Sequence, residues 1–210
     1  PVKGTPKAKN SVSYLIAADG ALEADKTLTA ASSPYLVDRA GLTINVGATL
    51  TLDAGAVVKV TSGNEPWIRV VGTIVANGTA SAPVVFTSFY DDEYGGDMNG
   101  DGSASTPAAG NWRRLLIDTE STGSSFTNTL VRYGGNANDV DPVAKRGAIG
   151  VDSATVPFDG LIVEKSGYYG LALENSASTI ANSRFSTSTN SSVSATGLYI
   201  SGGSPTVASS

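Results

Sequence analysis

Short apolar runs separated by glycine, asparagine and aspartate recur along the chain from Pro34 onward. Each run spans only a few residues, is rich in Val, Ile and Thr, and ends at a residue that favours a turn. This pattern is typical of short β-strands joined by tight corners, and the helix-forming residues Met and Glu are scarce. We therefore predict an all-β protein. The clearest runs are LTI (42–44), TLTL (49–52), AVVKV (56–60), WIRVV (67–71), GTIVA (72–76) and PVVFTS (83–88).

The spacing of these runs predicts a solenoid. Related strand segments recur at steps of about 22 residues, which aligns Thr29, Thr51 and Thr73. A period of about 20–30 residues with several short strands matches one turn, or rung, of a parallel β-helix with three strands and three corners. A β-sandwich also has strands every ~8–12 residues, but it needs no such repeat and is therefore the alternative. A later repeat aligns Gly147, Gly170 and Gly197.

The composition excludes several classes of chemistry. The chain has no His and no Cys, which excludes Ser–His–Asp and Cys–His catalysis, zinc–thiolate sites and disulfides. The net charge is −5 and only 16% of the residues are charged, so no basic stripe is available for nucleic acid. No apolar run approaches the ~20 residues of a membrane-spanning helix. We therefore expect no nucleic-acid partner and no membrane insertion, and a cysteine-free chain is compatible with secretion.

Two stretches resemble a known family. The segments SPYLV…GATLTLDAGAVVKV…GTIVANGTASAPVVFTS (33–88) and FDGLIVEKSGYYGLALENSASTIANSRF (158–185) are similar to the opening and middle rungs of bacterial surface proteins of the pectate-lyase-like, right-handed parallel β-helix superfamily. The resemblance implies a right-handed parallel β-helix located outside the cell or on its surface. Because that superfamily includes lyases, hydrolases, adhesins and structural stalks, the resemblance does not define an activity.

The chain divides into two expected regions. Residues 1–33 are predicted to be an N-terminal linker with leading strands, and residues 34–210 a β-helix of about six to seven rungs. A loop insertion at 89–111 interrupts the rungs, and a smaller excursion covers 134–146. The closing residues SGGSPTVASS contain a rung-like SPTV and no capping element. Since solenoids need covered ends, we expect the C-terminal end to be truncated or covered by a partner.

The inserted loop contains a motif with metal chemistry. The spacing Asp97-x-Asn99-x-Asp101-Gly102 is that of a calcium loop, in which alternate residues direct oxygens to a common centre. Ala108 stands where a helix–loop–helix site has its bidentate Glu, so further ligands must come from elsewhere. The surface β-helix relatives carry a similar acidic insertion, which the resemblance interprets as calcium binding. The alternative is a solvated acidic loop, but clustered carboxylates repel one another without a cation. The predicted Ca2+ ligands are Asp97, Asn99, Asp101 and Ser103, completed by Asp91, Asp92 or Glu93.

Other residue groups suggest an enzyme or a sugar-binding module. In a calcium-dependent lyase Arg113 or Arg114 would lie beside the metal, although both are more simply explained as balancing the acidic loop. Glycoside hydrolysis requires paired carboxylates, and aromatic rings can stack on sugars. The candidate carboxylate pairs are Asp118/Glu120, Asp139/Asp141 and Asp159/Glu164. The candidate stacking residues are Trp67, Trp112, Tyr133, Tyr168, Tyr169 and Tyr199. Asn175, Asn182 and Asn190 are candidates for a stacked corner asparagine, which would be a structural ladder rather than a site.

The function expected from the sequence is a non-enzymatic one. We expect an extracellular or cell-surface β-helix with a structural calcium site, acting as a structural, adhesive or self-assembling component. Its expected partners are further copies of itself, end to end or side by side, or surface glycans. The alternatives are a calcium-dependent polysaccharide lyase or hydrolase and a carbohydrate-binding module. These classes differ in whether acidic and basic side chains converge in one groove.

Overall fold

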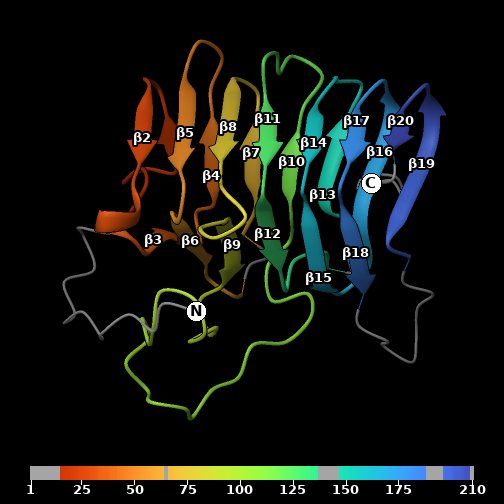
Figure 1. Cartoon of the computed structure of the whole chain (residues 1–210). Helices are drawn as coiled ribbons and strands as arrows, with labels where there is room; N and C mark the ends of the chain where they lie inside the picture. Colours follow the sequence, from red (N-terminus) through yellow and green to blue (C-terminus); the bar gives the residue numbers. More distant parts are fainter. Residues whose placement is uncertain (1–14, 64–65, 137–146, 188–195, 209–210) are drawn as a thin grey trace.

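A computed structural model describes residues 15–63, 66–136, 147–187 and 196–208. In this part of the chain three parallel sheets wind around one core (Figure 1). Successive strands enter the first, second and third sheet in turn, and every pairing between neighbouring strands is parallel. This confirms the predicted parallel β-helix and excludes the sandwich, whose sheets are antiparallel.

The described strands form six complete rungs and two strands of a seventh. The first sheet contains β1 (Ala21–Leu22), β4 (Leu42–Ile44), β7 (Ile68–Val70), β10 (Leu115–Ile117), β13 (Gly147–Asp152), β16 (Tyr169–Ser176) and β19 (Leu198–Gly203). The second contains β2 (Lys26–Leu28), β5 (Thr49–Asp53), β8 (Thr73–Asn77), β11 (Ser125–Thr127), β14 (Pro157–Asp159), β17 (Thr179–Ala181) and β20 (Thr206–Ala208). The third contains β3 (Tyr35–Val37), β6 (Val57–Val60), β9 (Val84–Ser88), β12 (Thr129–Arg132), β15 (Ile162–Ser166) and β18 (Arg184–Thr187). Between β2 and β3 lies one 3₁₀ turn, η2 (Ala30–Ser32).

Columns of inward side chains build the core. Because side chains alternate along a strand, residues in register on neighbouring rungs stack on the same face. One column in the second sheet includes two phenylalanines, Phe126 and Phe158, whose ring centroids lie 5.3 Å apart with the rings stacked. The full column runs through Leu28, Leu52, Ala76, Phe126, Phe158, Ile180 and Val207.

Corners of the coil use residues that tolerate a left-handed backbone. Asn128, Gly160 and Asn182 follow β11, β14 and β17 and have φ angles of 42°, 70° and 50°. Asn175 has φ 49° and lies near the end of β16, at a different corner. Asn175 and Asn182 are therefore corner residues, but they belong to different corners and do not stack in one ladder, and Asn190 lies outside the described residues.

Two details of the predicted register were wrong. Thr51 lies opposite Thr27 and Val75, not opposite Thr29 and Thr73, because the step between β2 and β5 is longer than the sequence repeat suggests. Gly147 lies opposite Tyr169, one residue away from the predicted Gly170. A slip by one residue exchanges the inward and outward faces of a strand, so a repeat of residue types is a poor guide to register.

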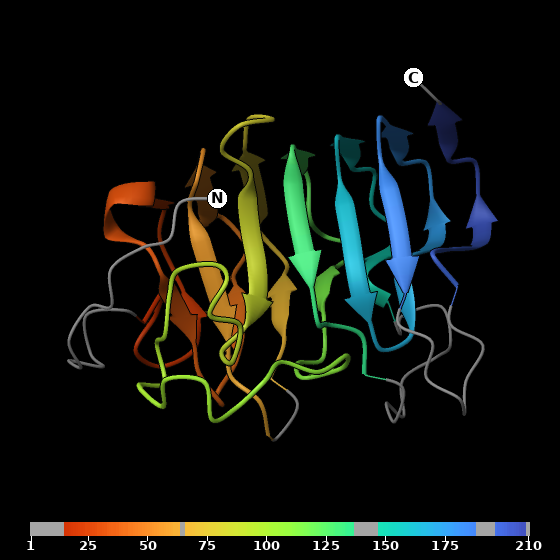
Figure 2. The same ribbon diagram turned by 60° about the horizontal axis from the view of Figure 1, so that its bottom comes forward.

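The inserted loop leaves the coil after β9 and returns before β10. In Figures 1 and 2 this yellow-green segment projects beside the third sheet, close to the early rungs. The leading strands β1 and β2 pair with β4 and β5, so they belong to the coil itself. None of the described residues forms a helix long and apolar enough to cross a bilayer.

Candidate metal centre

The start of the inserted loop is packed against the outer face of the third sheet. Three apolar side chains on that face, Val57, Val85 and Leu130, form a small buried cluster, and the half-buried Tyr94 packs against it. Next in the loop, Gly95 has φ 76°, and a Cβ atom there would lie 2.8 Å from Cβ of Pro34. These contacts fix residues 94 and 95 close to the strands.

A buried arginine holds the same part of the loop. Arg132 on β12 is only 2% exposed, and its Nη1 lies 3.1 Å from Oδ2 of Asp91 and 2.7 Å from Oε2 of Glu93. Its Nε lies 2.9 Å from Oε1 of Glu164 on β15. The hydroxyl group of Thr87 donates a further hydrogen bond to Asp91. The guanidinium group is thus surrounded by carboxylates from the loop and from the neighbouring rung.

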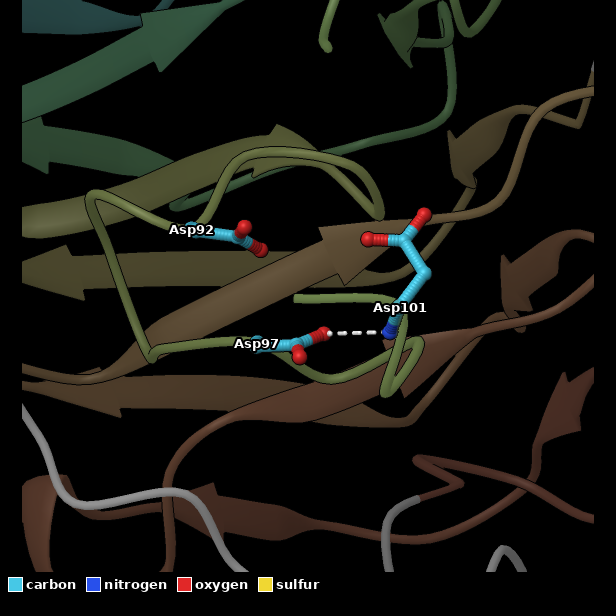
Figure 3. A group of neighbouring side chains, drawn as sticks. All are labelled: Asp92, Asp97 and Asp101. Atoms are coloured by element: carbon cyan, nitrogen blue, oxygen red, sulfur yellow. Dashed lines mark hydrogen bonds between the residues drawn. The ribbon is translucent and has the colours of Figure 1, made fainter. Parts of the chain in front are cut away.

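Beyond this anchor, three aspartates gather. Carboxylate oxygens of Asp92, Asp97 and Asp101 all lie within 4.8 Å of one another, and Figure 3 shows the three side chains around a common space. Backbone N–H groups of residues 100, 101 and 102 donate to the Asp97 carboxylate at 2.6, 3.3 and 2.9 Å. The loop backbone therefore curls around Asp97 and presents its carboxylate at a fixed position.

Two side-chain oxygens, one in this group and one next to it, have no hydrogen-bond partner among the described residues. They are Oδ1 of Asp92 and Oδ1 of Asn99, and both atoms are buried. The amide group of Asn99 donates instead to Oδ2 of Asp101 at 2.9 Å and to Oγ of Ser105 at 2.8 Å. A buried oxygen without a donor is costly, and a hard cation would satisfy it. The donor set consists of oxygens only, which suits calcium.

The charge of the group also matches a divalent cation. Three carboxylates contribute −3, and the fully buried ammonium group of Lys59 contributes +1, which leaves −2. Nζ of Lys59 donates to the carbonyl group of Gly96. Burial lowers the pKa of Lys59, while Asp92 and Asp91 oppose that shift. Burial likewise raises the pKa of Asp92, against the attraction of Lys59.

The loop backbone has the opposite effect on Asp97. Hydrogen bonds from backbone N–H groups, that of Gly102 foremost, lower the pKa of this carboxyl group. Asp97 therefore stays ionised in the pH range where a metal ligand must carry its charge. The group thus contains Asp97, whose carboxylate is held in place and favoured in its ionised form, and Asp92, whose carboxylate is partly desolvated.

The predicted ligands divide into two sets. Asp92, Asp97 and Asp101 come together with Asn99 beside them, whereas Asp91 and Glu93 are directed to Arg132. The reason is that Arg132 offers these two carboxylates a buried cation. Ser103 is exposed in the same turn, and its carbonyl group remains a predicted ligand.

Sequence reasoning missed Lys59 and Arg132. Both stand at outward positions of strands in the third sheet, Lys59 in the otherwise apolar run AVVKV. A single charged residue within a buried strand indicates a partner above that strand, and this signal would have identified Lys59.

Several members of the alternative catalytic groups have structural partners or are buried. Arg113 stacks over the Trp67 ring at 5.0 Å, and Arg114 is fully buried. Of the carboxylate pairs, Asp118 binds Arg69 at 2.5 Å, Asp159 accepts a hydrogen bond from Asn182, and Glu164 binds Arg132. Asp139 and Asp141 lie outside the described residues.

The predicted sugar-stacking residues are also scattered. Trp112 is fully buried, with Nε1 donating to the Arg132 carbonyl group at 2.8 Å, and Tyr133 is 6% exposed. Tyr169 stacks on Tyr199 and meets Tyr168 edge to face, far along the coil from Trp67. The predicted set therefore does not form one aromatic platform, because Trp112 and Tyr133 serve the core.

Comparison with known proteins supports the fold. A family model described as "pectate-lyase like beta helix domain" matches residues 20–141, more than half of the chain. No curated protein and no solved structure matches the chain. The matched segment includes the whole acidic loop.

Proposed function

Because this chain belongs to the family of pectate-lyase-like β-helix domains, we propose that it is a non-enzymatic structural or adhesive module with a structural calcium ion. The fold hosts many functions, so the proposal rests on the acidic loop and not on the family. The observation that carries this proposal is the group of Asp92, Asp97 and Asp101 with the two unpartnered oxygens beside it. The ion would join residues 97–101 to Asp92, which the anchored part of the loop already holds.

The basic groups near the acidic cluster support a structural role. Abstraction of a sugar proton requires a base that can reach the bound substrate. Lys59 is fully buried beneath the loop, and Arg132 is enclosed by three carboxylates. Arg113 packs on Trp67. Neither Lys59 nor Arg132 is therefore placed to act on a polysaccharide at the cluster.

The openness of the cluster favours a location outside the cell. Asp101 is exposed, and Asp92 and Asp97 are only partly buried, so water competes with a bound ion at this site. We therefore expect weak binding, in the range of about 10⁻⁴–10⁻³ M that extracellular modules have. Calcium at this concentration is typical of the exterior, where a surface module with self-assembling or glycan-binding properties would work.

Thermal unfolding with and without calcium tests the proposal. Calcium at roughly tenfold to hundredfold above its Kd would add about 1.4–2.7 kcal/mol to the free energy of unfolding, because it binds only the folded state. For a chain of this size that corresponds to a rise in Tm of roughly 3–10 °C relative to chelator. Calorimetric titration of calcium into the chelated protein would give the Kd directly.

Two variants separate the site from general charge effects. Asp101→Asn removes a cluster carboxylate and should abolish most of the calcium-dependent shift. Asp53→Asn removes an exposed carboxylate on β5 and should leave the shift unchanged. Identical melting curves in calcium and in chelator, together with no bound metal by elemental analysis, would refute the calcium site.

Incubation with pectate, alginate and xylan in the presence of calcium tests the non-enzymatic part. We expect neither unsaturated products nor new reducing ends. Robust turnover that is lost in Arg113→Ala would instead establish the lyase alternative.

A further inference from the structure

The sequence contains two Asn-Gly pairs, Asn77-Gly78 and Asn99-Gly100. An asparagine that precedes glycine is prone to lose its side-chain amide, because glycine has no Cβ atom to keep its backbone nitrogen away from the asparagine side chain. This reaction also requires a backbone that can bend locally, so the surrounding structure decides which pair reacts. The two pairs place the same chemistry in two different structural settings.

The first pair is held by the coil. Asn77 is the last residue of β8 and lies in register with Asp53 on one side and Thr127 on the other. The N–H group of Gly78 donates to the carbonyl group of Thr127 at 3.0 Å. A Cβ atom on Gly78 would lie only 2.1 Å from the carbonyl oxygen of Asn128, so this backbone is closely enclosed. Moving the Gly78 nitrogen toward the Asn77 side chain would break the sheet at this corner.

The second pair lies in the inserted loop, outside every strand of the described chain. Gly100 is exposed and has φ 70°, and its N–H group donates to the Asp97 carboxylate at 2.6 Å. Asn99 is likewise held by side chains, because its amide group donates to Asp101 and Ser105. Side-chain contacts in an exposed loop open more readily than a sheet ladder does, so this pair has the local freedom that the first pair lacks.

We propose that Asn99 is a site of spontaneous deamidation. The Gly100 nitrogen gives up its proton to solvent and bonds to Cγ of Asn99, and the side-chain nitrogen of Asn99 leaves as ammonia. Water then opens the five-membered succinimide ring that has formed. Cleavage of the new Cγ–N bond gives aspartate, and cleavage of the original peptide C–N bond gives isoaspartate. The reaction consumes only water.

The aspartate product changes the acidic cluster. The Asn99 amide group donates to Oδ2 of Asp101 at 2.9 Å, whereas a carboxylate in its place would repel Asp101. The excess of two negative charges that Asp92, Asp97 and Asp101 keep beside Lys59 becomes three. Deamidation should therefore destabilise the metal-free loop and strengthen its binding of a divalent cation. This consequence rests on the proposed calcium site, whereas the deamidation itself does not.

Peptide mapping of the aged full chain tests the modification. After incubation at mildly alkaline pH, chymotryptic cleavage at Tyr94 and other aromatic residues places Asn77 and Asn99 on separate peptides, and mass spectrometry gives the deamidated fraction of each. We expect Asn99 to react at least about tenfold faster than Asn77, because the ladder must open before Asn77 can react. In guanidinium chloride, where the sheet is lost, the two rates should become similar. Similar rates in the folded protein, or no detectable reaction at Asn99, would overturn the proposal.

Two variants test the consequence for the cluster. Asn99→Asp, which has the structure of the aspartate product, should melt below the wild type in chelator and bind calcium with a roughly tenfold lower Kd, because one more negative charge lies near the ion. Asn77→Asp adds the same charge to β8 and should leave the Kd unchanged. If the wild type binds calcium and Asn99→Asp binds it no more tightly, the consequence is refuted. If neither binds calcium, the calcium site fails, and the peptide map alone decides whether Asn99 is modified.

Discussion

Arg132 should be among the most sensitive polar positions of the protein. In the variant Arg132→Met the side chain keeps its apolar stem but loses the guanidinium group. Asp91, whose side chain is 3% exposed, is then left as a buried carboxylate, with the Thr87 hydroxyl group and the backbone N–H group of Glu93 as its remaining hydrogen-bond donors. Glu93 and Glu164 also lose their cation, but they are more exposed and water can solvate them in part.

The expected destabilisation follows from this burial. Removing one partner of a buried ion pair typically costs about 3–5 kcal/mol, because the other charge stays in a poorly solvated place. For a chain of about 200 residues this lowers Tm by roughly 6–20 °C. Urea unfolding followed by tryptophan fluorescence and circular dichroism at neutral pH would measure it. Replacing Asp91 by Asn in the same variant should recover part of the loss, because the unpaired charge is removed.

Arg69→Met provides a control with the opposite expectation. Arg69 and Asp118 form a shorter ion pair, at 2.5 Å, but the arginine side chain is 41% exposed and that of Asp118 is 13% exposed, against 3% for both Arg132 and Asp91. A pair with one solvent-exposed partner is closer to the surface class, which contributes about 0–1 kcal/mol, so this variant should cost much less than Arg132→Met. If Arg69→Met cost as much as Arg132→Met, or if Arg132→Met were nearly neutral, burial would not be the deciding factor and the reasoning would fail.

Two further predictions concern the core and the loop. Phe158→Ala should lower the free energy of unfolding by about 3–5 kcal/mol, since it leaves a cavity in the core and removes the ring stacked on Phe126. Pro157→Ala, on the exposed face of the same strand, should change it by no more than about 0.5 kcal/mol. Urea unfolding of both variants checks this. Because its folded pKa is lowered, the Asp97 carboxyl group stabilises the fold above its usual pKa of about 3.9 and loses this effect as pH falls through the folded value. In the presence of chelator, Asp97→Asn should therefore lower the free energy of unfolding at neutral pH. Its Tm, measured against pH, should also fall less steeply toward acid than that of the wild type. An equally steep fall in both proteins would contradict this.

The fold was predictable because the sequence pattern that produces it is repeated along the chain. Short β-branched runs separated by corner residues occur in almost every rung, so a single misassigned run does not change the result. Register was not predictable in the same way. The steps in the first sheet from β1 to β4 and from β4 to β7 differ, since Leu22 pairs with Ile44 but Ile44 pairs with Val70. Corner lengths, which carry little pattern, set these steps.

The candidate site was predictable only in its local part. Asp97, Asn99 and Asp101 are close in sequence, and a tight loop brings alternate residues together whatever surrounds it. The roles of Asp91 and Glu93 depend on Arg132, which lies about forty residues further along the chain and reaches them only because β12 is the neighbour of β9 in the coil. Contacts between rungs are invisible in a local motif until the register is known.

The acidic residues of the loop therefore fall into two electrostatic layers. The inner layer, named for its contact with the strands, consists of the buried Asp91 and the more exposed Glu93; Arg132 neutralises both, and they hold the start of the loop without any ion. The outer layer, Asp92, Asp97 and Asp101, has Lys59 as its nearby cation and keeps an excess of two negative charges. Adjacent residues 91 and 92 belong to different layers, because Asp91 is bound by Arg132 and Thr87 whereas the Asp92 carboxylate lies beside those of Asp97 and Asp101. A cation bound by the outer layer would thus add order to a loop whose base the protein already fixes, which is the arrangement expected of a structural ion.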